Sequence, residues 1–226
     1  MRPDETIRSL DELIGSRSIL AHPFYLAWQR GDLSRAQLAT YATSYYPHVA
    51  AFPGYLERAR DRATNPFVRA ELGNNLADEL GNPAAHNELW LDFAEEFGVD
   101  RTALATAQPR PATADMIDTF NARTSGDTAG AIAALYAYES QQPEVSAQKL
   151  VGLRERYGVT SARALAYFEV HAEADVHHSA GERQAITHCL VDGASPEAVL
   201  ESAKEALDAY WGLLDGICDQ ARIARC

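Results

Sequence analysis

One short segment, YFEVHAEADVHHSAGER at residues 167–183, restricts the folds open to this chain more than any other feature. Four of its side chains follow at steps of four, four and three residues, so an α-helix would carry them on one face: Tyr167, His171, Asp175 and His178. Burying imidazole and carboxylate groups in a core costs free energy unless a partner neutralises them, and a divalent metal ion is the simplest partner. A solvated polar face is the alternative reading of this segment alone.

The rest of the sequence also favours helices. Alanine is abundant, β-branched residues are few, and no stretch alternates apolar and polar residues as a strand would. Helix start and stop signals predict helices near residues 4–15, 18–30, 34–62, 65–80, 83–98, 112–123, 127–157, 160–190 and 195–224, with a loop at 99–111. Because no long linker or internal repeat interrupts them, we predict an all-α, single-domain bundle of about seven to nine helices over residues 1–226.

Charge and cysteine usage argue against several classes of partner. The formal net charge is −12, so we expect neither nucleic acid nor an anionic membrane as a partner. Cys189, Cys218 and Cys226 form no C-x-x-C pair, which is typical of a reducing compartment without a disulfide framework. The start of the chain lacks an apolar targeting segment, and no run of eighteen apolar residues follows. We therefore expect a cytoplasmic protein.

Two further segments place carboxylates and imidazoles at unusual positions. Glu79 and His86 flank a Gly-Asn-Pro break at 81–83 and are two helical turns apart, so a nearly continuous helix axis would put both on one face. Glu139 ends the apolar run 129–138, where a carboxylate has no route to water. Pro143 also removes the backbone donor that the Glu139 carbonyl would use in a helix, and such irregularity often accompanies a functional site.

These residues predict one metal centre. Its candidate ligands are three carboxylates and three imidazoles: Glu79, His86, Glu139, His171, Asp175 and His178. Three carboxylates nearly neutralise two divalent cations. Mixed nitrogen and oxygen ligands suit iron or manganese better than a structural zinc ion, which usually recruits thiolates. His22, His48, His177 and His188 are not expected in the site.

The ligand order and its surroundings resemble the haem-oxygenase-like di-metal oxidases. The similarity extends over nearly the whole chain, through LAHPFYLAWQRGDLSRAQLATYATSYY, DELGNPAAHNELW, YAYESQQPEVSAQKLVGLRERYG and YFEVHAEADVHHSAGER. More narrowly, it resembles the CADD-like branch (chlamydia protein associating with death domains), which comprises self-sacrificing 4-aminobenzoate synthases of folate biosynthesis. The resemblance implies a haem-oxygenase-like fold, two ions of iron, manganese or both, dioxygen as co-substrate, an external reductant and a homodimer.

The same resemblance implies roles for three more residues. Tyr25 in HPFYLAW matches the tyrosine whose side chain becomes the aromatic ring of the product, and Tyr41 in LATYATSYY matches its assisting neighbour. Lys149 in SAQKLVGL matches the lysine that donates the amino group. It is one of only two lysines in the chain, the other being Lys204. Tyr138 and Tyr167 resemble residues that line the same pocket.

Other functions stay open at this point. An oxidase of the same fold that acts on a free amino acid, fatty acid or quinone precursor would use the same six ligands. A thiaminase-like hydrolase needs a mid-chain cysteine nucleophile, and no cysteine precedes Cys189. A haem oxygenase would use His22 as an axial ligand and leave the other five ligands unexplained. A helical module that binds a death domain is the non-enzymatic alternative.

Overall fold

The computed structural model describes residues 1–81 and 84–224, which form eleven α-helices and one 3₁₀ turn and contain no strand. In chain order the elements are α1 (Pro3–Ser16), η1 (Ile19–Ala21), α2 (Pro23–Arg30), α3 (Arg35–Arg62), α4 (Pro66–Gly81), α5 (His86–Glu96), α6 (Arg101–Ala105), α7 (Pro111–Thr124), α8 (Thr128–Glu139), α9 (Gln142–Glu155), α10 (Ala162–Val191) and α11 (Pro196–Ala221). The all-α prediction is confirmed.

The helix count exceeds the predicted seven to nine for two local reasons. The expected helix over 127–157 is divided between α8 and α9, because the helical hydrogen bonding is interrupted after Glu139, one turn before Pro143. The expected loop at 99–111 contains the short helix α6, whose first turn is capped by the Asp100 side chain. Helix α5 begins at His86 rather than near residue 83, and Pro83 itself lies outside the described residues.

Capping residues fix where the site helices begin. Ser34 and Gln37 form a capping box at the start of α3, with the Ser34 hydroxyl accepting from the Gln37 backbone. Ser161 accepts from the Ala164 backbone at the start of α10. These caps satisfy backbone N–H groups that a helix start would otherwise leave open, so the two longest helices of the described chain start at defined positions.

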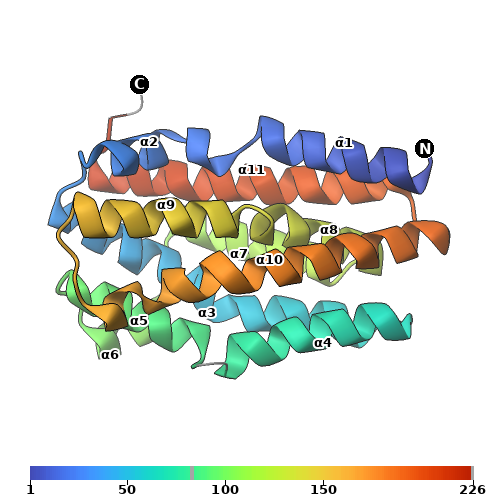
Figure 1. Ribbon diagram of the computed structural model, residues 1–226, viewed down its shortest axis with the longest axis horizontal. Coiled ribbons are helices and arrows are strands. Elements are labelled where there is room, and N and C mark those ends of the chain that lie inside the picture. The colour runs from blue at the N-terminus through green and yellow to red at the C-terminus, as the bar shows by residue number, and fades with distance from the viewer. Residues whose placement is uncertain (82–83, 225–226) are drawn as a thin grey trace.

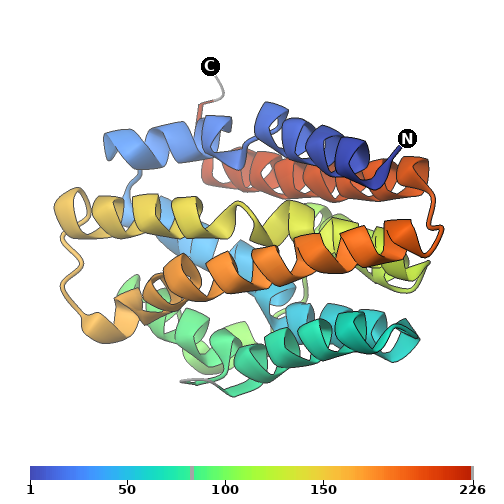
Figure 2. The ribbon, with the colours of Figure 1, turned by 45° about the vertical axis from the view of Figure 1, so that its right-hand side comes forward.

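The helices pack as layers that run roughly along one axis. Helices α1 and α11 lie side by side along one edge of the molecule and α4 lies along the opposite edge, with α9 and α10 between them (Figure 1). A turned view shows the same order (Figure 2). Helix α8 lies inside, packed on α10 and α11, and its side chains from Ala129 to Glu139 are all buried. A carboxylate at the end of α8 is therefore carried into the centre of the bundle.

Close packing of α9 on α2 brings two distant parts of the sequence together. Gly152 of α9 faces Trp28 of α2, and a Cβ atom at this glycine would overlap the indole ring. The missing side chain therefore lets the two helices approach closely. Lys149, one turn before Gly152 on α9, consequently reaches the space between α2 and α3.

Two further expectations concern compartment and membrane. Among residues 1–81 and 84–224, no helix has the length and the apolar composition that crossing a membrane requires. Cys189 is a free thiol, and Cys226 lies outside the described part of the chain.

Candidate functional site

The first group of predicted ligands comes from three helices. Glu79 lies near the end of α4, His86 is the first residue of α5, and His171 is in the middle of α10. The Glu79 Oε1 atom is 2.9 Å from His86 Nδ1 and 3.8 Å from His171 Nε2, and the three side chains are buried. Burial alone would raise the pKa of Glu79, but hydrogen bonding by the two imidazoles lowers it to about 2. Glu79 is therefore a buried carboxylate held in its charged form.

The second group lies beside the end of α8. Glu139 ends α8, and Asp175 and His178 come from α10. The His178 Nδ1 atom is 3.3 Å from Asp175 Oδ1 and 3.8 Å from Glu139 Oε1. Burial lowers the pKa of His178, but the carboxylates of Asp175 and Glu139 outweigh this and raise it to about 9. The metal-free fold therefore holds a proton on His178 at neutral pH.

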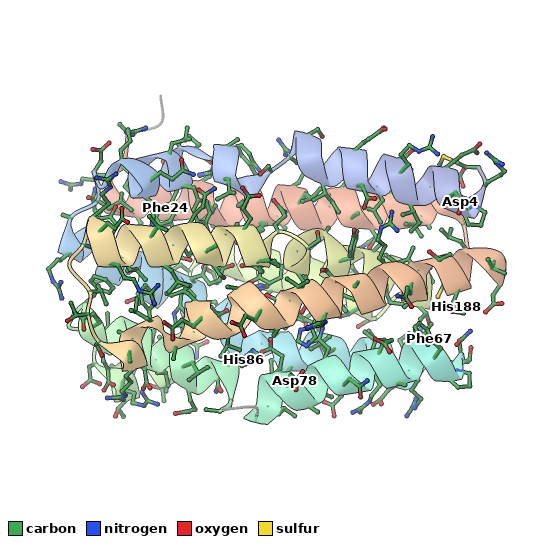
Figure 3. All side chains as sticks on the ribbon, viewed as in Figure 1. Asp4, Phe24, Phe67, Asp78, His86 and His188 are labelled. Atoms are coloured by element: carbon green, nitrogen blue, oxygen red, sulfur yellow. The ribbon has the colours of Figure 1, made fainter. Side chains whose placement is uncertain are left out.

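Neighbouring groups orient the imidazoles of His171 and His178 toward the other ligand side chains. The His171 Nδ1 atom lies 2.7 Å from the Tyr167 carbonyl oxygen, which can only accept, so Nδ1 carries the proton and Nε2 faces Glu79. His178 Nε2 is 3.1 Å from Asp78 Oδ2, which leaves Nδ1 facing the carboxylates. Figure 3 places the labelled Asp78 and His86 on either side of the α4–α5 junction, next to α10. Such outer partners commonly fix metal-binding histidines.

The six side chains form two groups that each fit a metal ion. Glu79, His86 and His171 form one group and Glu139, Asp175 and His178 the other, and the ligand atoms within each group lie within 4.8 Å of one another. Asn75 Nδ2 donates to both oxygens of Glu139 at 3.0 Å, which steadies that carboxylate. Three buried carboxylates in one core are costly without cations. The donor set is the mixture of nitrogen and oxygen that iron and manganese accept.

A second cluster surrounds Lys149. This lysine is 2% exposed, and its Nζ atom is 2.5 Å from the Tyr41 hydroxyl. Five aromatic rings lie 5.1–6.0 Å from Nζ: Tyr25, Tyr41, Tyr45, Trp90 and Phe168. Burial lowers the pKa of Lys149 well below its ordinary value, because water no longer solvates the ammonium form. Burial therefore favours the neutral, nucleophilic form of the amine.

Tyrosine hydroxyls form a network beside this lysine. The Tyr45 hydroxyl is 3.0 Å from that of Tyr210 and 2.9 Å from that of Tyr138. The Tyr210 hydroxyl is in turn 3.5 Å from that of Tyr25, and Gln142 Nε2 donates to Tyr210 at 3.3 Å. Burial raises the pKa of Tyr25 well above its ordinary value, and its tyrosine neighbours add to the effect. The phenol of Tyr25 is therefore kept protonated.

Aromatic side chains connect the two clusters. The Tyr167 ring stacks on His171 with centroids 4.0 Å apart, and Trp90 contacts Tyr167 at 4.7 Å. Trp90 also contacts Tyr41, with centroids 5.6 Å apart. The ligand cluster and the Lys149 cluster are thus joined through a continuous, buried aromatic layer.

The structure gathers the nine predicted site residues into these two clusters. It also adds residues that the sequence did not single out. Glu182 lies four residues after His178 on the same helix face, and this spacing was the available signal. No sequence signal pointed to Asp78 and Tyr210, because only the packing of α4 and α11 brings these two residues to the site. The excluded histidines lie elsewhere: His22 caps α2, His48 sits in an aromatic cluster, His177 is exposed, and His188 packs on Phe67.

Comparisons with known proteins identify the family to which the chain belongs. Residues 39–211 match the family described as iron-containing redox enzymes. The 4-aminobenzoate synthase of Chlamydia pneumoniae is 39% identical over 97% of this chain and 98% of its own length. The protein of the same name from Nitrosomonas europaea is 36% identical over 93% of this chain and 89% of its own length.

A solved structure confirms the fold class. The crystal structure of a CADD-like protein of unknown function from Nostoc punctiforme superposes with a TM-score of 0.77, covering 98% of this chain and 99% of that one at 23% identity. The match over residues 39–211 and the two relatives establish the family. The chain belongs to the iron-containing redox enzymes with a haem-oxygenase-like fold, together with the proteins named 4-aminobenzoate synthase.

Proposed function

We propose that this protein is a 4-aminobenzoate synthase that builds its product from its own side chains. In this proposal Tyr25 supplies the aromatic ring, Lys149 supplies the amino nitrogen, and Tyr41 assists. The six carboxylate and imidazole ligands hold two metal ions, iron, manganese or one of each. Dioxygen is the oxidant and an external reductant supplies electrons. The names of the relatives support the product, and the Lys149 cluster supports the self-sacrificing route.

One observation carries the proposal: the place of a substrate beside Lys149 is filled by the protein's own tyrosines. The Lys149 Nζ atom lies 5.2 Å from the ring centroid of Tyr25 and 2.5 Å from the Tyr41 hydroxyl. All three side chains are at most 2% exposed. A buried neutral amine next to a phenol ring is the pair of groups that an aromatic amine made from side chains requires.

Each part of the chain has a distinct task in this chemistry. Burial of Lys149 favours loss of its proton and keeps bulk water away from the amine. The Tyr41 hydroxyl, within hydrogen-bond distance of Nζ, holds the amine at a fixed position next to Tyr25. Tyr210, steadied by Tyr45 and Gln142, holds the phenol oxygen of Tyr25 from the other side. When bound, the metal ions would supply the redox chemistry with dioxygen.

The test uses the fact that the chain has only two lysines. Protein carrying ε-¹⁵N-lysine is loaded with ferrous iron, manganese or both, and given a reductant and dioxygen, with no organic substrate and with unlabelled lysine in the buffer. We expect at most one ¹⁵N-labelled 4-aminobenzoate per chain, and peptide mass spectrometry should find the losses at Tyr25 and Lys149.

Matched variants separate this route from its alternatives. K204R should keep the labelled product and K149R should abolish it. Y25F should also abolish the labelled product. Y136F should not, because the Tyr136 hydroxyl donates a hydrogen bond to Asp11 and takes no part in the Lys149 cluster. A metal-loaded protein that forms no product and keeps both side chains intact would contradict the proposal. It would favour an oxidase of the same fold that acts on a free amino acid or fatty acid.

A further inference from the structure

Glu182 is a buried carboxylate that the six-ligand centre leaves unused. It lies on α10, four residues after His178 and seven after Asp175, so it shares their face of the helix. It is 3% exposed, and its carboxyl group lies against that of Glu139. Apart from this contact with the Glu139 carboxyl group, neither of its oxygens has a hydrogen-bond partner among the described residues. Carboxylates are almost never fully buried without a partner, so this one needs an explanation.

The open oxygen atoms gather on one side of the second ligand group. The Asp175 Oδ2 atom likewise has no hydrogen-bond partner in the described part of the chain. The Glu139 oxygens, by contrast, accept from Asn75. These three oxygen atoms, next to Glu139, offer lone pairs that no nitrogen or hydroxyl donor of the described residues satisfies. A divalent cation satisfies all of these atoms together.

The two ligand groups differ in chemistry when Glu182 is included. The first group offers one carboxylate and two imidazoles, from Glu79, His86 and His171. The second offers Glu139, Asp175 and His178, and Glu182 would raise its carboxylates from two to three. Carboxylate-rich sites favour hard cations such as Mn²⁺ over softer ones.

We infer that Glu182 is a fourth protein ligand of the second metal position, a carboxylate that turns from Glu139 toward the cation when the cation binds. Its carboxyl is not among the atoms that converge within 4.8 Å, so ligation requires rotation about its side-chain bonds. The inference rests on the two-metal centre of the proposed function but not on its reaction. Metal binding is therefore measured without dioxygen and without product formation.

The experiment compares Mn²⁺ binding by the metal-free full chain and by E182Q, using anaerobic equilibrium dialysis and the EPR signal of free Mn²⁺. The amide keeps the shape and removes the charge, so we expect the affinity of one of two Mn²⁺ ions to fall by about 10- to 100-fold. The other ion should bind as in the parent protein. E173Q changes an exposed carboxylate of the same helix and is expected to bind like the parent.

Thermal unfolding of the metal-free variants separates ligation from packing. E182Q should be at least as stable as the parent, because an amide costs less to bury than a carboxylate. If E182Q does not fold, E182D provides the test. Its side chain is one methylene shorter, so it should also lower the affinity for one Mn²⁺ ion. Unchanged binding of two ions by a folded variant would overturn the role of Glu182. A parent protein that binds no Mn²⁺ or Fe²⁺ would overturn the metal centre itself.

Discussion

The environment of a single lysine sets much of the chemistry at the residue scale. Lys149 lies among aromatic rings, and the Tyr41 hydroxyl contacts its amine. In the unfolded chain this amine keeps its ordinary pKa of about 10.4. In the folded protein burial lowers the pKa of Lys149 well below that value. Burial therefore disfavours the ammonium form, and folding costs free energy at pH values below about 10.4.

K149M should remove this cost, and the size of its effect should depend on pH. The unfolded parent binds one more proton than the folded parent between the lowered folded pKa and about 10.4, so its stability rises with pH in that window. Each pH unit adds about 1.4 kcal/mol there. The advantage of K149M in the free energy of unfolding should thus shrink from pH 7 toward pH 10.

Urea unfolding of both proteins without metal at several pH values measures this difference. K204M is the matched control, because Lys204 is an exposed residue paired with Asp208. A K149M advantage that stays constant from pH 7 to pH 10 would show that Lys149 is protonated in the folded protein.

At the scale of the elements, interruptions between helices position the site residues. The helical hydrogen bonding is interrupted between α8 and α9, and this ends the apolar α8 at Glu139. The break between α4 and α5 lets His86 turn back toward Glu79, which a single continuous helix would hold further along its axis. The close approach of α9 to α2 then depends on Gly152. Element ends and one small residue therefore complete the two clusters, to which the long helix α10 contributes three of the six ligands.

G152A tests the closeness of α9 and α2. The added methyl group would overlap Trp28, so either the ring or the helix must move. We expect the free energy of unfolding to fall by about 1–3 kcal/mol, the usual cost of overpacking a core. We also expect a lower yield of ¹⁵N-labelled 4-aminobenzoate per chain, because Lys149 would move away from Tyr25.

G212A is the control, since a Cβ atom at Gly212 meets no atom within 4 Å. Alanine is the better helix former by about 1 kcal/mol, so G212A should be equal to or more stable than the parent in the same unfolding measurement. If both variants behaved alike, the contact between α9 and α2 would not limit the site.

At the scale of the whole molecule, the ligand residues connect four helices that are separate in the sequence. They come from α4, α5, α8 and α10, so bound cations would cross-link these four helices. Ligands that bind only the folded state raise its stability by mass action. The same cations must displace protons, because the pKa of His178 is raised to about 9 in the metal-free fold.

Metal binding should therefore stabilise the protein more at higher pH. His178 has a folded pKa above its unfolded value of about 6.5, so its proton stabilises the metal-free fold fully below pH 6.5, and this contribution is lost as pH rises through 9. Metal affinity rises over the same range, up to about tenfold per pH unit for each proton released. The increase in Tm caused by excess Mn²⁺ under anaerobic conditions should be larger at pH 8 than at pH 6. An equal increase at both pH values would contradict a proton on His178.

The sequence by itself determined the helical class and the ligand stripe, because both depend on local spacing. A helix repeats every 3.6 residues, so steps of four, four and three residues between Tyr167 and His178 place side chains on one face without knowledge of the partners. The break near Glu139 was also visible, since Pro143 has a local effect.

Only the tertiary structure decided which distant side chains meet. Lys149 and Tyr25 are separated by more than a hundred residues, and no local pattern connects them; the resemblance alone paired them before the packing of α9 on α2 brought them together. Tyr210 and Asp78 entered through the packing of α11 and α4, which no spacing encodes. The sequence predicts an irregularity at Pro143 within one helix, whereas the structure has two helices there, and the short α6 adds one more. Local periodicity fixes faces, whereas long-range contacts depend on how those faces pack.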